Sequence, residues 1–349
     1  MTDICEIIRD ARKKGASDIH ISEAMPLWYR VNGRLQAAEL QPSPEEVRSL
    51  LLSLLSERHR AAFEAGEDAD FSLETPEGER QRVNVFRQQK KLAATIRLLN
   101  GRIPSLEELK MPTTLYEMAK QPRGLILVTG PTGSGKSTTL AAMIDHINET
   151  RSDHIITIED PIEYVYQGKQ ALIHQREVGA DARSFASALR SALREDPDVI
   201  LVGEMRDYET ISAAVTAAET GHLVLSTLHT IGAAQTIDRI IDVCPAGAQN
   251  QIRGQLAAVL RGVITQQLLP LAGGKGRCAA TEILVGTDAV ANLIREGKCY
   301  QIPSILQSGA ALGMHSLNAD LARLVSMGRI TREAAERCAT DKSDLQNYL

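Results

Sequence analysis

A glycine-rich segment between an apolar run and a helical pattern holds the residues best suited to bind phosphate. The apolar run covers 124–129, helical spacing covers 138–147, and the segment reads Gly130-Pro131-Thr132-Gly133-Ser134-Gly135-Lys136-Ser137-Thr138. Its glycines let successive backbone N–H groups point into one concavity, and the helix N-terminus adds positive potential. We expect Lys136 to reach the β- and γ-phosphates and the Ser137 hydroxyl to bind Mg²⁺. The spacing predicts a nucleoside triphosphate site; the alternative is a chance match in a glycine-rich turn.

Acidic residues follow two further apolar runs. Glu163 comes shortly after the run 155–158, and Glu204 comes after the run 199–202. In open α/β sheets, ligands bind beyond the carboxyl ends of the strands, and phosphoryl transfer to water needs Mg²⁺ and a group that orients the water. We expect Glu163 and Glu204 to supply these carboxylates; for either alone, a solvated turn is the alternative. Because Gly203 precedes Glu204, the Mg²⁺-binding Asp usual at the end of this strand in P-loop enzymes cannot be assigned here.

Two histidines bracket the apolar run 223–228. In a straight strand His222 and His229 would lie about 20 Å apart, so one phosphate group cannot contact both. The strand-end rule predicts that His229 lies near the nucleotide. His222 is then expected at the opposite edge, in packing or at a subunit contact. A purely structural role is the alternative for each.

Three arginines lie on or beside expected strands of the first hundred residues: Arg82, Arg87 and Arg97. The ordinary interpretation of such arginines is a solvated surface. The functional interpretation is that the first domain folds over the nucleotide and offers them to the γ-phosphate. Arginine fingers of this kind raise phosphoryl-transfer rates by several powers of ten.

Composition narrows the classes of partner. The 349 residues carry a net charge of −5 and only 3% aromatic residues, which disfavours nucleic acid as a partner. The five cysteines are scattered, which predicts reduced thiols in a cytosolic protein rather than disulfides or a zinc site. No apolar run approaches the roughly 20 residues that span a bilayer. The first helix is amphipathic rather than a signal peptide. We therefore expect a cytoplasmic protein without direct membrane insertion.

The periodicity predicts two domains. Residues 1–99 should form a small α+β domain, residues 100–112 a linker with a short helix at 105–109, and residues 113–349 an α/β domain that is helical from about 286. In the first domain the patterns predict helices at 4–13 and 44–65 and strands at 18–21, 69–73, 80–88 and 93–98, with a hairpin turn at Asn32-Gly33. In the second, apolar strands at 125–129, 154–159, 199–203 and 223–227 alternate with helices, which predicts a parallel, doubly wound sheet.

Four ordered segments resemble the Walker A, Asp box, atypical Walker B and His box of the secretion ATPase superfamily. They are Gly130–Thr138, Thr157–Glu163, Val202–Asp207 and Thr216–Thr230. Within the superfamily the chain is similar to the PilT family of type IV pilus retraction ATPases. The similarity runs nearly end to end and includes Gly15–His20, Arg82–Gln88 and Gln175–Gly179.

The resemblance implies a homohexameric motor that hydrolyses ATP with Mg²⁺ to drive pilus retraction, pilin disassembly and twitching motility. Each subunit would have a PAS-like N-terminal domain and a RecA-like ATPase domain, with nucleotide between them. Implied partners are an inner-membrane pilus platform protein and a paralogous retraction ATPase, which would hold the ring at the inner face of the inner membrane. By position, Glu204 matches the Walker B glutamate and Glu163 the Asp-box glutamate proposed as the catalytic base. Arg82, Arg87 and Arg97 occupy the region that contributes arginines.

Two features favour retraction over a pilus assembly or type II secretion motor. The chain starts almost directly at the PAS-like domain, and the Cys-pair zinc motif of those motors is absent. The segment Ala289–Glu296 resembles the retraction-class motif AIRNLIRE, but Ala291 stands where that motif has Arg. This difference leaves a weakly hydrolysing, PilU-like accessory or regulatory role as an alternative.

Overall fold

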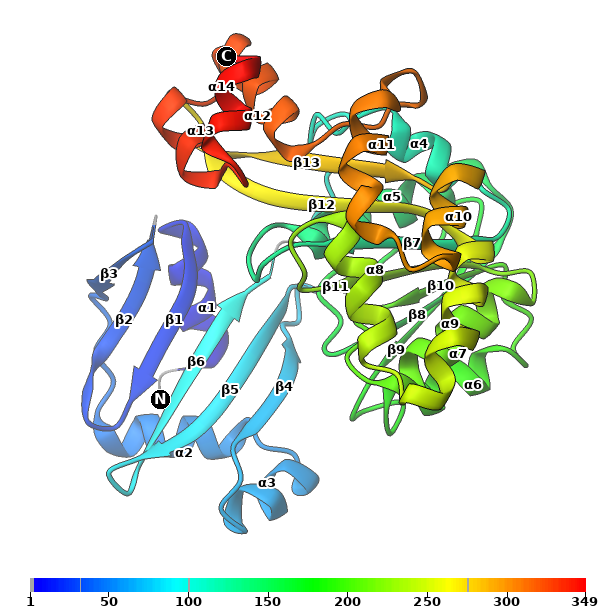
Figure 1. The fold of residues 1–349 in the computed structure, drawn as a ribbon. Coiled ribbons are helices and arrows are strands. Elements are labelled where there is room, and N and C mark those ends of the chain that lie inside the picture. The colour runs from blue at the N-terminus through cyan, green and yellow to red at the C-terminus, as the bar shows by residue number, and fades with distance from the viewer. Residues whose placement is uncertain (1–2, 32, 100, 275) are drawn as a thin grey trace. The chain divides into compact units, whose positions relative to one another are not determined.

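The structure is a computed structural model that describes residues 3–31, 33–99, 101–274 and 276–349. The chain forms two compact units, one of residues 1–102 with 161–165 and one of residues 103–160 with 166–349 (Figure 1). The segment 103–112, expected to be part of a linker, belongs to the second unit, where Leu106 and Met111 are buried.

The first unit is an antiparallel sheet with helices packed against it. The strands lie in the order β3-β2-β1-β6-β5-β4. Their bounds are β1 (Ala16–Ser22), β2 (Met25–Val31), β3 (Arg34–Ala37), β4 (Ala69–Glu74), β5 (Arg80–Gln88) and β6 (Lys91–Leu98), and the helices are α1 (Ile4–Lys13), α2 (Pro44–Ser53) and α3 (Glu57–Glu64). Helix α1 contacts β1, α2 contacts β1 and β6, and α3 contacts β4. This is the α+β architecture that the sequence predicts.

The core of the first unit follows from the spacing of its apolar residues. In α1, the Asp3 carboxylate caps the helix, and Ile4, Ile7, Ile8 and Ala11 fall on one buried face. Strand residues with the same parity complete this core, as Ile19, Ile96 and Val83 lie opposite one another in register and are fully buried. The alternate residues of these strands therefore lie on the other face of the sheet.

The expected helix at 44–65 is wrong, because the structure has two helices there. Helix α2 begins after Ser43, whose side chain forms a capping box with Glu46, and ends at Ser53. Ser56 is extended and caps α3 by accepting a hydrogen bond from the His59 N–H. A second cap within one apolar periodic pattern thus breaks the helix. The hairpin of β2 and β3 forms with Val31 opposite Arg34, while Asn32 lies outside the described residues.

The second unit contains a mostly parallel sheet in the order β13-β12-β7-β11-β10-β8-β9. Its strands are β7 (Gly124–Thr129), β8 (His154–Glu159), β9 (Leu172–Glu177), β10 (Val199–Val202), β11 (Leu223–Leu228), β12 (Leu260–Pro270) and β13 (Arg277–Val285). The helices are α4 (Thr114–Ala119), α5 (Lys136–Thr150), α6 (Phe185–Ala192), α7 (Tyr208–Glu219), α8 (Ala233–Asp242), α9 (Ala246–Val259), α10 (Asp288–Arg295), α11 (Ile302–Ser308), α12 (Leu317–Ser326), α13 (Arg332–Cys338) and α14 (Lys342–Tyr348), with 3₁₀ turns η1 (Cys299–Gln301) and η2 (Ala310–Leu312).

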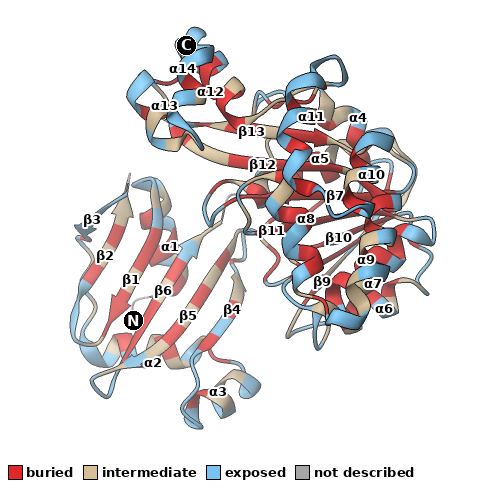
Figure 2. Cartoon of the chain, viewed as in Figure 1, coloured by how far each residue is buried: buried red, intermediate tan, exposed pale blue. Residues whose placement is uncertain are grey.

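The central strands of this sheet are buried on both faces. Every residue of β7, β10 and β11 is buried (Figure 2). On β7, Leu125 and Leu127 belong to the large core cluster that includes residues of α7, α8 and α9. By alternation, Ile126 and Val128 point to the other face. This two-sided burial explains the continuous apolar runs in the sequence, and the predicted α/β class is confirmed.

Three strands were not anticipated. Strand β9 is a polar edge strand, paired parallel to β8. Strand β12 pairs parallel to β7, and β13 returns antiparallel to β12, so the sheet is not parallel throughout. The expected helix at 105–109 is also wrong. Leu109 N donates to Ser105 O in one helical bond, and Lys110, with φ of 56°, ends the turn.

A long β12–β13 hairpin carries the last helices of the chain (Figure 1). Leu269, Cys278 and Ala280 near its far end form a small core with α12, α13 and α14, including Leu321 and Leu345. From 286 onward the chain is helical, as expected, apart from a bridge between His315 and Ile283. Among the described residues, no helix has the length and apolar character that crossing a membrane requires.

Candidate nucleotide-binding site

The phosphate loop leaves the end of β7 and enters α5, as its sequence predicts. Gly130, Gly133 and Gly135 have φ of 138°, 79° and 90°, which L side chains rarely adopt. A Cβ atom on Gly130 would also lie 2.2 Å from the Gln266 carbonyl oxygen, and one on Gly135 would lie 2.7 Å from Gln266 Nε2. The loop thus requires glycine at all three positions for its backbone shape, and at Gly130 and Gly135 also for its close approach to β12.

Polar groups of the loop are arranged to receive an anion. Lys136 is buried, and its ammonium donates to the carbonyl oxygens of Gly130 (2.8 Å) and Pro131 (3.0 Å), so it lies across the loop rather than in solvent. The Ser134 hydroxyl is buried and has no hydrogen-bond partner among the residues that the structure describes. Ser137, at the N-terminus of α5, is exposed. A buried cation and an unpartnered hydroxyl at a helix N-terminus fit a phosphate chain.

His229 lies between Lys136 and Glu204. Its Nδ1 atom is 3.5 Å from Lys136 Nζ, and its Nε2 atom is 3.5 Å from Glu204 Oε2, both at the outer limit of a hydrogen bond. An ammonium has only donors, so His229 Nδ1 accepts. A neutral His229 therefore carries its proton on Nε2 and directs it at Glu204. His229 thus contacts the lysine of the phosphate loop and Glu204, and its proximity to a bound nucleotide stays a prediction.

The loop that carries Glu204 is fixed to the neighbouring strand β11. Thr227 Oγ1 donates to Gly203 O at 2.6 Å, and Met205 N donates to Thr227 O at 3.2 Å. Glu204 is mostly buried, and Arg206 Nε pairs with its Oε1 at 2.6 Å. One carboxylate thus has a cation on one oxygen and the His229 imidazole beside the other.

A Mg²⁺ ion would rely on few protein ligands. No group of three or more His, Cys, Asp or Glu residues that could hold a metal ion occurs in the described part of the chain. Two candidate oxygen ligands are the exposed Ser137 hydroxyl at the start of α5 and the Glu204 carboxylate, which His229 connects to Lys136 of the loop. This donor set fits a Mg²⁺ that takes most of its ligands from water and from nucleotide phosphates.

Glu163 lies in the loop that follows β8 and is half-buried. This loop, 161–165, groups with the first unit. In the second unit, the acid at the end of β8 is Glu159, whose Oε1 accepts from Thr157 Oγ1 at 2.7 Å and from Gln175 Nε2 at 3.2 Å. Glu159 is thus engaged in holding β8 to β9.

The three arginines of the first unit divide between the two faces of its sheet. Arg82 and Arg97 are cross-strand neighbours on the face opposite the helices. Arg82 forms two hydrogen bonds with Asp70, at 2.6 and 3.1 Å, and Arg97 pairs with Asp18 at 2.9 Å. Arg87 has the opposite parity, and its guanidinium lies 4.0 Å from the Phe63 ring centroid and donates to Phe63 O. Arg87 therefore ties β5 to α3 through Phe63. The guanidinium groups of Arg82 and Arg97 are solvent-exposed on the opposite face of the sheet.

His222 lies at the other end of β11 from His229. Its Nδ1 is 2.8 Å from Ala217 O and 3.2 Å from the Thr220 hydroxyl, and its carbonyl accepts from Gly124 N. These contacts close the turn between α7 and β11. They favour the packing role among the alternatives for His222.

Sequence reasoning missed the residue that supports the loop from β12. Gln266 contacts Ser134 and Thr139. Its neighbour Thr265 instead joins β12 to β7, through a hydrogen bond of 2.9 Å between the Thr265 and Thr129 hydroxyls. The Val-Ile-Thr-rich composition of 263–265 is a strand signal that would have located β12, although not its neighbour.

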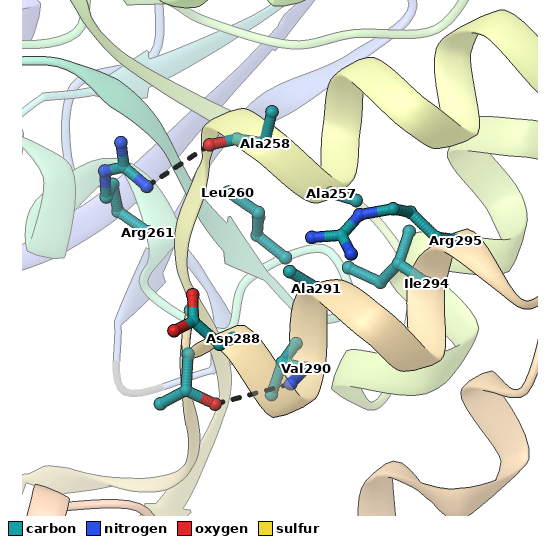
Figure 3. Close-up of a pocket in the computed structure, with 11 residues that line it drawn as sticks. Ala257, Ala258, Leu260, Arg261, Asp288, Val290, Ala291, Ile294 and Arg295 are labelled. Carbon is teal, nitrogen blue, oxygen red and sulfur yellow. Dashed lines mark hydrogen bonds between the residues drawn. The ribbon is translucent and has the colours of Figure 1, made fainter.

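A cavity of about 140 Å³ lies apart from the phosphate loop, between the end of α9, the start of β12 and helix α10 (Figure 3). Ala291 and Arg295 of the AIRNLIRE-like segment line it, together with Arg261. Since Ala291 is small, a longer side chain at this position would fill part of the cavity.

The mostly parallel sheet, the phosphate loop at its central strand and the acid at the end of β10 define a P-loop ATPase. The family model described as Type II/IV secretion system protein matches residues 1–342, and the chain belongs to this family.

Individual relatives agree with this assignment. The chain is 49% identical over 338 residues to a protein of Pseudomonas aeruginosa named type IV pilus retraction ATPase PilT, covering 97% of this chain and 98% of that one. It is 52% identical over 317 residues to a twitching motility protein of Neisseria gonorrhoeae, covering 90% and 85%. A crystal structure of the pilus retraction motor PilT with bound ADP superposes with a TM-score of 0.92 at 47% identity, covering 99% of this chain and 100% of that one.

Proposed function

We propose that this protein is a motor ATPase whose hydrolysis of ATP drives the retraction of a type IV pilus. The ATPase activity in this proposal is supported by the contacts that run from Lys136 through His229 to Glu204, beside a loop shaped for phosphate. The pilus half is supported by the similarity to PilT over nearly the whole chain.

The residues divide the chemical work. Backbone N–H groups of residues 130–138 and the Lys136 ammonium would bind the phosphates. Ser137 and Glu204 would hold Mg²⁺, which neutralises charge on the β- and γ-phosphates when it is bound. His229, with its proton on Nε2, would keep the Glu204 carboxylate oriented. Glu163 is proposed to orient the attacking water or accept its proton.

Arginines of the first unit would complete the site on closure. Arg82 and Arg97 are the better candidates for the γ-phosphate, since their guanidinium groups lie on an exposed sheet face and their acidic partners are on the same sheet. The Arg82–Asp70 pair is solvent-exposed and worth less than about 1 kcal/mol, so Arg82 can exchange its carboxylate for a phosphate. Asp18 is buried, so release of Arg97 costs more.

The assembly would be a homohexameric ring in the cytoplasm, at the inner face of the inner membrane. It would pass its motion to an inner-membrane pilus platform protein, with a paralogous retraction ATPase as a further partner. These assignments rest on the resemblance to retraction ATPases.

Purified protein should hydrolyse ATP with Mg²⁺, and the gene should restore twitching to a strain that cannot retract its pili. Hydrolysis without restored twitching would favour an assembly or type II secretion motor. Negligible hydrolysis would favour the accessory role that Ala291 suggests. Turnover that requires DNA would instead indicate a nucleic-acid translocase.

A further inference from the structure

Gln266 on β12, outside the motif 130–138, forms hydrogen bonds with the phosphate loop and with helix α5. Its side chain is 2% exposed. Its amide Nε2 donates to the Ser134 carbonyl at 2.6 Å, and its Oε1 accepts from the Thr139 hydroxyl in the first turns of α5 at 2.7 Å. A carbonyl oxygen can only accept, so the nitrogen of the amide must face Ser134, and its oxygen then faces Thr139.

The register of β12 places Gln266 level with the start of the loop. Thr265 pairs with Thr129, the last residue of β7, and the two hydroxyls are hydrogen-bonded. The next residue, Gln266, therefore lies beside Gly130. Cβ atoms at Gly130 and Gly135 would collide with the backbone and the side chain of Gln266, respectively. Both ends of the loop are thus packed on this one residue.

We propose that Gln266 is a positioning residue that orients the loop's backbone donors toward the nucleotide phosphates, an inference that rests on the proposed ATPase function. In a planar trans peptide, the C=O and the following N–H point in opposite directions. By holding the Ser134 carbonyl, Gln266 makes the Gly135 N–H point away from β12. Donors fixed in advance bind a phosphate more strongly than donors that must reorganise on binding.

The chemistry of the amide explains why this position needs Gln. Glutamine supplies one donor for Ser134 and one acceptor for Thr139 in a single planar group. A glutamate keeps the acceptor but sets a carboxylate oxygen against the Ser134 carbonyl, and a leucine keeps the volume and loses both hydrogen bonds. In either variant the buried Ser134 carbonyl has lost its side-chain donor, which favours rotation of the Ser134–Gly135 peptide.

The experiment measures the Kd of Mg-ADP by calorimetry for the full chain and for Gln266→Glu and Gln266→Leu, with melting temperatures recorded without nucleotide. Thr265→Val is the matched control, because it removes the neighbouring buried hydrogen bond on the same strand without touching the loop. We expect the Gln266 variants to raise Kd about tenfold or more, the equivalent of one strong hydrogen bond. Thr265→Val should lower the melting temperature and leave Kd within about twofold.

Thr139→Val provides a second test if the Gln266 variants do not fold. It removes the hydrogen bond from the Thr139 hydroxyl to Gln266 Oε1, so the Gln266 amide is less firmly oriented. The Kd for Mg-ADP should therefore rise severalfold. The inference would be overturned if folded Gln266 variants bound ADP within about twofold of the parent. If the Gln266 variants do not fold, the same result in Thr139→Val would overturn it. An equal loss of affinity in Thr265→Val would also overturn it. A parent chain that binds no ADP would overturn the proposed function itself, and one that binds ADP without hydrolysing ATP would overturn only the motor assignment.

Discussion

The Nε2 atom of His229 lies 3.5 Å from Oε2 of Glu204, while the other ring nitrogen of His229 faces Lys136. The imidazole thereby separates the lysine of the phosphate loop from the acid of the neighbouring strand. Because Lys136 can only donate, the proton of a neutral His229 is directed to the Glu204 side. Glu204 is thus held from two sides, by His229 and by Arg206.

Lys136→Ala should abolish hydrolysis while the chain remains folded. Lys136 is the only side-chain cation in the motif 130–138, and no other group there can neutralise the γ-phosphate. The measurement is phosphate release by purified protein whose circular dichroism matches that of the parent. Turnover within about tenfold of the parent would contradict the phosphate-loop interpretation.

Glu204→Gln and Glu163→Gln should each lower kcat by roughly 10²-fold or more, as expected when a general base or water-orienting group is lost. Nucleotide binding should survive better in Glu163→Gln, because Glu204 is the proposed Mg²⁺ ligand. Calorimetry of ADP binding with and without Mg²⁺ separates the two effects. Loss of Mg²⁺-dependent binding in Glu163→Gln, with binding retained in Glu204→Gln, would mean that the two roles are exchanged.

Substitutions of Arg82, Arg87 and Arg97 should have different effects according to the sheet face on which each arginine lies. Arg82→Ala should slow hydrolysis at unchanged melting temperature, because its ion pair with Asp70 is solvent-exposed. Arg97→Ala should slow hydrolysis and also lower the melting temperature, because it removes the nearest cation from the buried Asp18 carboxylate. Arg87→Ala should instead destabilise the first unit by about 1 kcal/mol, because it removes the hydrogen bond and ring contact with Phe63.

Arg60→Ala is the matched control for surface charge, since Arg60 is exposed on α3 and its ion-pair partner within the described residues is Glu64 of the same helix. Turnover and thermal melting of the four variants are compared. If Arg82→Ala and Arg97→Ala behave like Arg60→Ala, neither arginine reaches the nucleotide.

His315 should make stability depend on pH between neutral and mildly acidic conditions. Burial lowers the pKa of His315 below 6.5, although nearby Asp320 opposes the shift and Arg323 adds to it. A depressed pKa means that the unfolded chain binds the proton more readily. The stability from this group is therefore complete above pH 6.5 and declines as the pH falls toward the folded-state pKa.

The test compares melting temperatures at neutral and mildly acidic pH for the parent and for His315→Gln, which retains a side chain able to bond Thr281. We expect the parent to lose more stability than the variant on acidification. An equal loss in both proteins would contradict the assignment to His315.

Local patterns predicted most of the site. The loop 130–138 and the acid after β10 are contiguous with their strands, so spacing alone located them. Strand parity, which can be read from the sequence, separates Arg82 from Arg87. By contrast, Gln266 reaches the loop only because β12 pairs with β7, and no local signal encodes a partner more than a hundred residues away.

The errors have equally specific causes. The pattern over 44–65 is continuous in apolar period, yet Ser56 caps a new helix within it. Strand β9 is polar and lies at the sheet edge, so neither alternation nor apolar content reveals it. The turn at 105–109 has the capping pair Ser105 and Glu108 of a helix start but is stopped at once by Lys110.

The small core at the far end of the β12–β13 hairpin has a consequence for nonsense mutations and for tagging. Helix α14 places Leu345 in that core, where the side chain is fully buried. A premature stop codon that removes only this helix would uncover Leu321 and Ala335, which invites aggregation and proteolysis although the whole ATP site is still encoded. An epitope tag should therefore leave helix α14 intact.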